Sequence, residues 1–480
     1  MYPRSPRLTL ALALLGASAL AACAVGPNYK RPPVETPPQF KEAAGWQPAQ
    51  PQDGVDRGDW WSVFNDQVLN GLEQKVAVSN QTIVGDEAAY KEARALVAEQ
   101  RAALFPTVDL TGGATESGQR VAAAVPGGKS SQVVARNYQV ALGASWAPDL
   151  WGRVRREIEN AKASAQASAA DLADAKLTIQ SELAADYFQL RLEDAEEALL
   201  KDTVAAYGKS LTITQNKYNA GVAAKADVLQ AKTQLETAQA SQVDLESARA
   251  QNEHAIAVLT GAAPADLTIA PISGWKPTVP TTPELVPSQL LQRRPDVAAA
   301  ERNAQAQNAL IGVQVAGYFP DITLSGSYGF ASSALGSLFK ASNAAWSYGA
   351  NATQLVFDAG ATSAKVRQAR AAYSQSVAQY RQTVLTAFQQ VEDELAADRV
   401  LQKEEPFKRA ASSDADQAEQ IFLNEYKAGT VDYTSVVTAE ATALTARQTL
   451  LTLQVQRMST QISLIEALGG GWTVKDLPKD

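Results

Sequence analysis

The sequence predicts a mainly α-helical, internally duplicated protein in which long helical hairpins accompany four strands of a membrane β-barrel. Three observations carry this prediction. Short motifs recur at a nearly constant offset along the chain, helix-compatible runs extend for about 60 residues, and four stretches of about ten residues alternate between apolar and polar side chains.

The duplication is visible in three pairs of motifs that occur in the same order. Tyr218-Asn219-Ala220-Gly221 recurs as Tyr426-Lys427-Ala428-Gly429, 208 residues later. Leu104-Phe105-Pro106 recurs as Tyr318-Phe319-Pro320, and Leu259-Thr260-Gly261 as Leu468-Gly469-Gly470. A glycine just past a helical run is the expected left-handed cap, because glycine adopts positive φ without a Cβ penalty. Gly221 and Gly429 therefore mark the tips of two helical hairpins.

Composition excludes several classes of function. The formal net charge of the 480-residue chain is −8, which gives no electrostatic support for binding nucleic acid. The single His and single Cys exclude most metal clusters and disulfide frameworks. There is no phosphate-binding loop, and we found no marked acid pair for hydrolysis. We therefore expect no enzyme activity, no catalytic residue, no bound metal and no cofactor other than a covalent lipid.

The N-terminus predicts export and lipidation. Residues 1–22 carry two arginines, an apolar run and small residues, which is the pattern of a signal peptide. Leu20-Ala21-Ala22-Cys23 resembles the bacterial lipobox, which implies cleavage before Cys23 and lipidation, palmitate included, of that residue. The alternative is ordinary signal cleavage beside a stray cysteine. Pro, Gln and Gly are frequent in the region that follows, so residues 23–59 are interpreted as an extended, lipid-anchored tether.

The rest of the chain divides into two repeats of helices and strands. About 60 helical residues at 1.5 Å each make a rod of roughly 90 Å, too long for a compact domain of this size. In the second repeat we expect the long helix, from about Ser363 to Tyr426, to be interrupted near Pro406. The expected segments are repeat 1 at 60–262, with its tip near 221; an irregular equatorial segment at 263–287; repeat 2 at 288–469, with its tip near 429; and a tail at 470–480.

The four alternating stretches are predicted at about 107–117, 133–147, 321–331 and 346–357. In each, one side is apolar with aromatic residues near the ends and the other side is small or polar, which is typical of outer-membrane barrel strands. Four strands cannot close a barrel, and an open sheet edge in lipid is not tolerated. The chain must therefore oligomerise. Three copies give twelve strands, although two or four copies would also close a structure.

Several motifs then resemble a known family, the TolC-like outer-membrane factors, and most of all its NodT-type lipoprotein branch. The matching motifs are Cys23-Ala24-Val25-Gly26-Pro27-Asn28-Tyr29, Ala147-Pro148-Asp149-Leu150-Trp151-Gly152-Arg153, Arg293-Arg294-Pro295-Asp296, Tyr318-Phe319-Pro320-Asp321-Ile322 and Val391-Glu392-Asp393-Glu394-Leu395. The resemblance implies a homotrimer with a twelve-stranded β-barrel and a periplasmic α-barrel. It also implies partners, namely a periplasmic membrane-fusion adaptor and an inner-membrane pump, of the RND type. A residue other than Asp at position 24 implies sorting to the outer membrane.

The same resemblance implies a gate at the periplasmic tips. Tyr426 matches the gate tyrosine and Asp227 the aspartate it bonds, while an assisting arginine of the family is replaced by Val431. The pore-narrowing aspartates fall at Ser435 and Thr438, so Asp432 is the nearest acid that could substitute. The alternatives are that Asp227 favours a helix N-terminus and that Tyr426 packs in the seam. Gly221 and Gly429 would meet the adaptor.

Two motifs receive structural interpretations. Arg293-Arg294-Pro295-Asp296 is interpreted as a helix start, and Glu392, Asp393 and Glu394, as consecutive helical residues, are expected to face different ways. Together the residues and the resemblance predict a passive exit duct of a tripartite efflux system in the outer membrane. The alternative is a periplasmic coiled-coil scaffold lipoprotein without a pore.

Overall fold

The computed structural model describes residues 24–42, 59–121, 131–272, 274–280, 293–472 and 474–478. The predicted signal peptide and Cys23 lie outside the described residues, as do parts of the predicted tether and equatorial segment. The elements are η1 (Trp60–Phe64), α2 (Gln67–Ser79), α3 (Gln81–Ala102), β1 (Thr107–Val121), β2 (Ser131–Trp146), α4 (Arg153–Asn219), α5 (Lys225–Leu259), η2 (Pro264–Asp266), α7 (Pro295–Ala316), β3 (Asp321–Ser332), η3 (Leu335–Ser337), η4 (Ala341–Asn343), β4 (Ala344–Thr353), α8 (Ala361–Ala428), α9 (Tyr433–Ala467) and η5 (Val474–Asp476).

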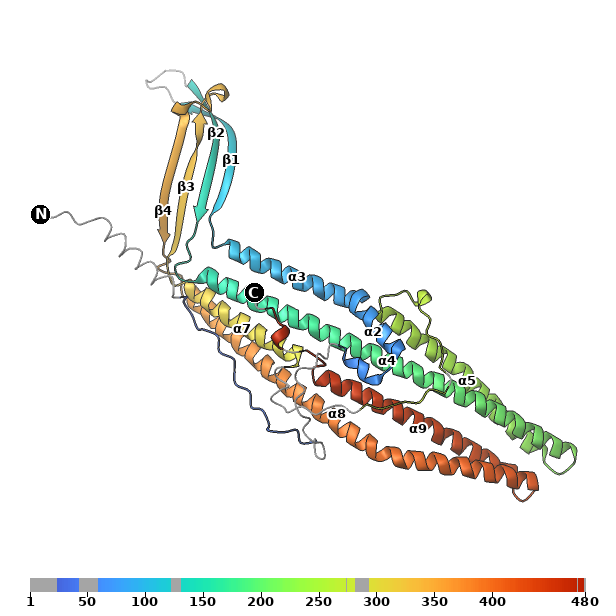
Figure 1. Cartoon of the computed structure of the whole chain (residues 1–480). Helices are drawn as coiled ribbons and strands as arrows, with labels where there is room; N and C mark the ends of the chain where they lie inside the picture. The colour runs from blue at the N-terminus through green and yellow to red at the C-terminus, as the bar shows by residue number, and fades with distance from the viewer. Residues whose placement is uncertain are drawn as a thin grey trace.

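The lengths of the helices repeat as closely as the motifs do. The short helices α3 and α7 have 22 residues each, the long helices α4 and α8 have 67 and 68, and the returning helices α5 and α9 have 35 each. In each repeat a β-hairpin stands between the short and the long helix. The sheet lies at one end of the helices and the two hairpin tips lie together at the other (Figure 1).

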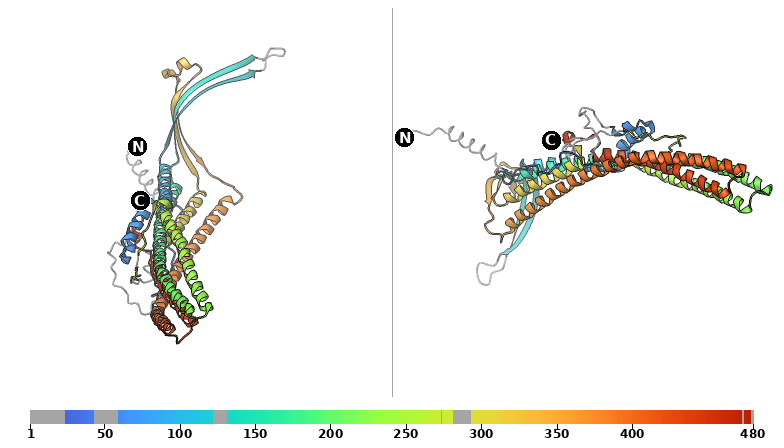
Figure 2. Two further views of the ribbon diagram at one scale, coloured as in Figure 1. Left: turned by 90° about the vertical axis from the view of Figure 1, so that its right-hand side faces the viewer. Right: turned by 90° about the horizontal axis from the view of Figure 1, so that it is seen from below.

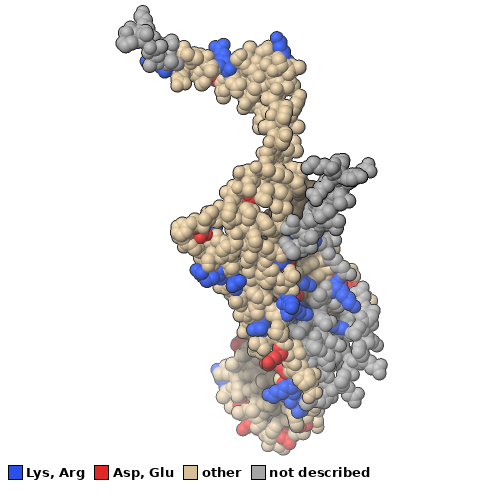
Figure 3. Space-filling model, turned by 90° about the vertical axis from the view of Figure 1, so that its left-hand side faces the viewer, with Lys and Arg blue, Asp and Glu red and all other residues tan. Residues whose placement is uncertain are grey.

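The four strands form one antiparallel sheet in the order β1-β2-β3-β4. Its register brings the apolar side chains of neighbouring strands to the same face. Leu142 of β2 lies opposite Leu110 of β1 and opposite Tyr328 of β3, which in turn lies opposite Trp346 of β4. All four of these side chains are exposed in the single chain. The sheet carries few charges along most of its length, in contrast to the helical part (Figure 3).

Strand β4 is displaced from its predicted range. It spans Ala344–Thr353, whereas the alternation placed it at about 346–357. Its pairing with β3 stops at Asp321 opposite Thr353. The residue before Asp321 is Pro320, which has no N–H group to continue the ladder. The strand therefore ends where its partner begins.

The predicted interruption of the long helix near Pro406 is wrong, because α8 continues through this proline. Proline removes one backbone hydrogen bond, but Pro406 is exposed, so water can reach the freed carbonyl. The preceding residue, Glu405, also holds the helix in place. Its carboxylate pairs with Arg409 one turn later and with Arg457 of α9. The long helices curve along their length, as the right-hand view of Figure 2 shows.

The helices pack around two apolar clusters near the middle of the molecule. The larger cluster gathers α2, α4 and α9 around buried residues such as Leu69, Leu183 and Tyr187, and the other joins α7, α8 and α9 around Val384 and Val391. The described part of the predicted equatorial segment packs against the larger cluster. Among the described helices, none combines the length and the apolar character needed to cross a membrane.

The N-terminal segment is bound to the helices along its described length, so residues 24–42 are not a free tether. Arg156 of α4 is only 3% exposed. Its guanidinium donates hydrogen bonds to the backbone carbonyls of Val25 and Gly26 and to the side-chain oxygen of Asn28. Farther along, the Glu392 carboxylate accepts the backbone N–H groups of residues 41 and 42 at 2.7 and 2.9 Å. The sequence pattern of Pro and Gln did not reveal these long-range partners.

We predict that Arg156→Ala releases the start of this segment. The change removes the three hydrogen bonds that the Arg156 guanidinium donates to the segment, each worth on the order of 1–3 kcal/mol. Trypsin should then cut the Lys30–Arg31 bond at least tenfold faster than in the unchanged protein, measured by mass spectrometry of a digestion time course. Arg153→Ala is the matched control, because Arg153 pairs only with Glu157 at the surface among the described residues. Equal cleavage of all three proteins would contradict the assigned role of Arg156.

Candidate gate at the hairpin tips

The two hairpin turns close in the same way. In the first, the N–H of Val222 donates to Lys217 O, and Gly221 has a φ of +75°. In the second, the N–H of Thr430 donates to Glu425 O, and Gly429 has a φ of +82°. This six-to-one hydrogen bond around a left-handed glycine is the Schellman cap. The prediction that both glycines are left-handed helix caps is confirmed.

Four helices meet in an apolar cluster just inside the turns, which we call the tip cluster. Its buried members are Ala231, Tyr426, Tyr433 and Val436, from α5, α8 and α9, and α4 packs against it through Leu211. The rings of Tyr426 and Tyr433 lie 5.2 Å apart between centroids and are tilted by 58°. Because the cluster draws on both hairpins, it holds the two tips against each other.

The predicted gate residues are close to this cluster but do not bond one another within the protomer. The Tyr426 hydroxyl is buried and has no hydrogen-bond partner among the described residues. The Asp227 carboxylate accepts the backbone N–H of Ala224 at 3.2 Å, at the start of α5. Asp432 caps α9 by accepting from the N–H and the hydroxyl of Ser435 at 3.1 and 2.9 Å. In this protomer the two acids stabilise helix starts, and Tyr426 contributes its ring.

The contact of Lys217 with Tyr426 was not predicted from the sequence. It lies in the last turn of α4. Its ammonium nitrogen is 4.1 Å from the centroid of the Tyr426 ring and donates a hydrogen bond to the carbonyl of the same residue. Lys217 thus links the first hairpin to the second in two ways. Its ammonium group makes a cation–π contact with Tyr426, and it places a positive charge at the C-terminal end of α8, where the helix dipole is negative. A lysine near a helix end is a common signal, but nothing local identifies a partner 209 residues away.

A buried carboxyl joins the hairpins below the tip cluster. Glu440 of α9 is 2% exposed, and one of its oxygens accepts a hydrogen bond from Ser210 of α4 at 2.6 Å. Its other oxygen has no partner among the described residues. Burial, and to a smaller degree the charge of Glu419, raises the pKa of Glu440 to about 7. Glu419 itself pairs with Arg447 at 2.7 Å. Glu440 is therefore accommodated best in its neutral form.

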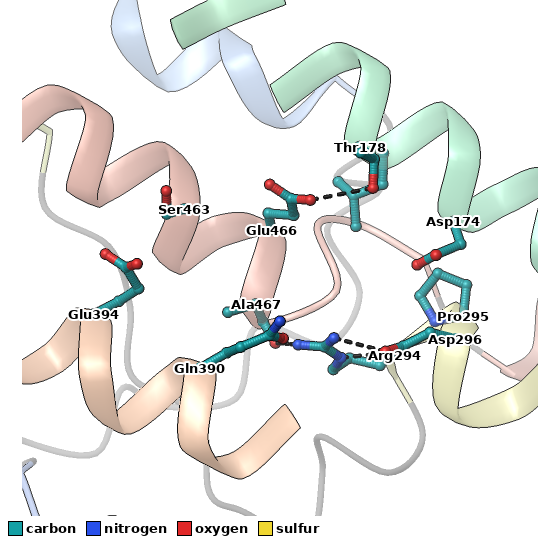
Figure 4. A pocket seen from close by; sticks show the side chains of 11 residues that line it. Asp174, Thr178, Arg294, Pro295, Asp296, Gln390, Glu394, Ser463, Glu466 and Ala467 are labelled. Atoms are coloured by element: carbon teal, nitrogen blue, oxygen red, sulfur yellow. Dashed lines mark hydrogen bonds and ion pairs between the residues drawn. The ribbon is translucent and has the colours of Figure 1, made fainter. Parts of the chain in front are cut away.

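A polar cavity lies where the start of α7 meets the end of α9 (Figure 4). The Arg294 guanidinium pairs with both oxygens of Asp296 and donates to the carbonyl of Ala467. The arginine-proline-aspartate motif is thus a helix start, as predicted, and it ties α7 to α9. The cavity of about 380 Å³ beside it is lined by three further carboxyls, Asp174, Glu394 and Glu466. Burial raises the pKa of Asp174 to about 6.

The three acids of the Val391–Leu395 motif have different surroundings. Glu394 lines the cavity, whereas Glu392 binds the N-terminal segment and Asp393 is exposed. The expectation that the three acids face different ways is confirmed.

We predict a pH-dependent stability of the seam around Glu440. The native pKa is above the ordinary value, so the carboxyl destabilises the closed seam once it ionises. Stability should fall as pH rises from about 4.5 through 7, by roughly 3 kcal/mol per protomer. Hydrogen exchange of residues 433–443, corrected for the intrinsic rate, should therefore lose about two powers of ten in protection between pH 5 and 8. Glu440→Gln should remove this slope, and a slope that persists in the variant would assign it to other groups.

Comparison with known proteins places this architecture in a family. A model of the outer membrane efflux protein family matches residues 72–262 and 286–470. The chain is 31% identical to the outer membrane protein OprJ of Pseudomonas aeruginosa over 467 residues, which cover 96% of this chain and 95% of that protein. It is 28% identical to the cation efflux system protein CusC of Escherichia coli over 459 residues, covering 95% and 97%.

Solved structures agree with the sequence relatives. The outer-membrane channel OprN superposes with a TM-score of 0.83 at 28% identity, covering 94% of this chain and all of that one. The open state of the MtrE outer membrane channel of Neisseria gonorrhoeae gives 0.79 at 27% identity, covering 94% and 98%. With the two repeats, the four-stranded sheet and the paired hairpins described above, these matches show that the chain belongs to the outer membrane efflux protein family.

Proposed function

We propose that this protein is a passive exit duct, formed by three copies, through which an efflux system discharges across the outer membrane. The observation that carries the proposal is the sheet. It has one apolar face, and its outer strands β1 and β4 have no further strand beside them among the described residues. An open edge is too costly in lipid, so neighbouring copies must pair with it. Three copies supply twelve strands, and α4 and α8 then extend the barrel as a tube.

The proposed duct is anchored by a lipid on Cys23, which lies outside the described residues. Support comes from its neighbours. The N–H of Val25 donates to the carbonyl of Trp151 at 3.0 Å, between the end of β2 and the start of α4. Ala24 packs so closely on Gly152 that any side chain at position 152 would collide with Ala24. Ala24, which Cys23 directly precedes in the sequence, thus lies beside the base of the sheet, where an acyl chain on Cys23 would enter the inner leaflet.

The proposed gate is the pair of tips. Tyr426 would keep it closed through its buried ring, while Asp227 and Asp432 would fix the starts of α5 and α9. The exposed turns at Gly221 and Gly429 would receive a periplasmic membrane-fusion adaptor, which connects the duct to an inner-membrane pump of the RND type. With energy supplied by those partners, the duct itself needs no enzyme activity and no cofactor beyond the lipid.

The alternative, a scaffold lipoprotein without a pore, accounts for the helices but not for the sheet. A scaffold in the periplasm would expose Leu110, Leu142, Tyr328 and Trp346 to water on one continuous face. Such a face is unfavourable in water and favourable in lipid.

We predict that Tyr426→Ala opens the duct and that Tyr426→Phe does not. Removing a buried aromatic ring costs on the order of 3–5 kcal/mol, whereas the hydroxyl has no hydrogen-bond partner to lose among the described residues. In planar bilayers the alanine variant should show at least a severalfold higher conductance than the unchanged protein. In cells it should increase susceptibility to vancomycin, which is too large for ordinary porins.

The phenylalanine variant separates two kinds of gate. If it conducts like the unchanged protein, the ring is what closes the tips. If it is as leaky as the alanine variant, a hydrogen bond from Tyr426 to Asp227 in the assembled trimer is the closing contact, and the ring-packing gate is excluded. Complete absence of channels in all the proteins would instead contradict the duct itself.

A further inference from the structure

A positively charged groove between α3 and α4 has no part in the duct or its gate. It has a volume of about 260 Å³. It lies between the C-terminal half of α3 and the N-terminal part of α4, against the C-terminal tail. Its charged residues are Arg94 and Arg101 of α3 and Lys162 of α4. Gln166 of α4 donates a hydrogen bond to the carbonyl of Pro478 at 3.0 Å, which fixes the tail as one wall.

The cations of this groove have no acidic partner among the described residues. No acidic residue is among those that line it. Within the part of the chain that the structure describes, Arg94, Arg101 and Lys162 form no ion pair. By contrast, Lys91 on the same helix pairs with Glu87 at 3.1 Å. Three converging cations without an ion-pair partner in the described part of the chain favour an anionic ligand.

The arginines are spaced to grip such a ligand along one side of α3. Seven residues separate Arg94 from Arg101, which is two helical turns, so both side chains lie on the same face about 10 Å apart. The Arg94 guanidinium lies over the ring of Tyr90, at 5.9 Å from its centroid. Stacking orients the planar fork of an arginine, which is suited to bidentate contacts with phosphate oxygens.

The position of the groove indicates the source of the anion. Helix α3 ends at Ala102, and β1 begins at Thr107, so Arg101 lies next to the base of the sheet. Between them, Phe105 is 69% exposed. Trp146, on the apolar face of the sheet, donates its indole N–H to the carbonyl of Leu104 at 3.0 Å. Exposed aromatic residues thus stand directly on the membrane side of the cations, as a headgroup and its acyl chains would require.

We propose that this groove binds an anionic phospholipid of the inner leaflet of the outer membrane. The phosphate lies among Arg94, Arg101 and Lys162, and the acyl chains run past Phe105 toward the apolar face of the sheet. Such a lipid holds α3, a short helix at the edge of the protomer, to the membrane surface. The inference goes beyond the proposed duct and requires only that the sheet lies in the membrane.

The test is native mass spectrometry of the full-length protein, delipidated in detergent and titrated with dioctanoyl phosphatidylglycerol. We expect saturable binding to the unchanged protein. Removing a charge-assisted contact weakens binding by about tenfold. Arg94→Gln combined with Lys162→Gln should therefore weaken it by at least about tenfold. Lys91→Gln is the matched control, because it removes a cation of α3 outside the groove, and its binding should be unchanged.

Two further probes identify the chemistry. Dioctanoyl phosphatidylcholine should bind much more weakly, because its headgroup has no net charge, and inorganic phosphate should also bind more weakly, because it lacks acyl chains. Equal binding of phosphatidylglycerol to the double variant and the unchanged protein would overturn the site. Phosphate binding as tight as that of the lipid would overturn the lipid assignment. If the double variant does not assemble, Arg101→Gln alone must show a severalfold loss.

Discussion

The backbone edges of the four-stranded sheet set the requirement on which the rest of the structure depends. Strands β1 and β4 each leave one row of N–H and C=O groups without a strand partner in the part of the chain that the structure describes. Water could satisfy these groups, but hydrocarbon cannot, and the register gives the sheet a face suited to hydrocarbon. Pairing between copies, as proposed above, would resolve the conflict. Once the sheets close, the helices that continue from β2 and β4 must stand in a ring, and their tips must converge.

The junction between sheet and helices is correspondingly rigid. Trp151, just after β2, stacks on Phe319, just before β3, with 4.9 Å between the ring centroids, and its indole donates to the carbonyl of Pro320. The two repeats are thus joined where strands become helices. The N-terminal segment is inserted at the same level. A side chain at Gly26 would collide with the backbone of Gly312 in α7, and a side chain at Gly312 would collide with Arg156 and the carbonyl of Val25. Three parts of the chain therefore meet in one small region: the start of the N-terminal segment, the two repeats and the base of the sheet.

Local patterns in the sequence predicted the helices and strands well. They did not predict the contacts between residues that are far apart in the sequence. Alternation located all four strands and glycine located both tips, because each depends on neighbouring residues only. Glu405, which precedes Pro406 in α8, pairs with Arg457 of α9, 52 residues away, and no local rule contains that contact. The same holds for the pairing of Lys217 with Tyr426 and for the bound course of residues 24–42. The predicted bond between Tyr426 and Asp227 depends further on how copies assemble.

The claim that three copies close one continuous tube is tested most directly by electron microscopy of the detergent-purified protein. The 67 residues of α4 make a shaft of roughly 100 Å, and tilted strands of this length add about 40 Å. Three closed copies should appear as hollow particles roughly 140 Å long, with a detergent belt at one end and threefold end views. Single rods, or particles whose sheet edge stays open, would contradict it.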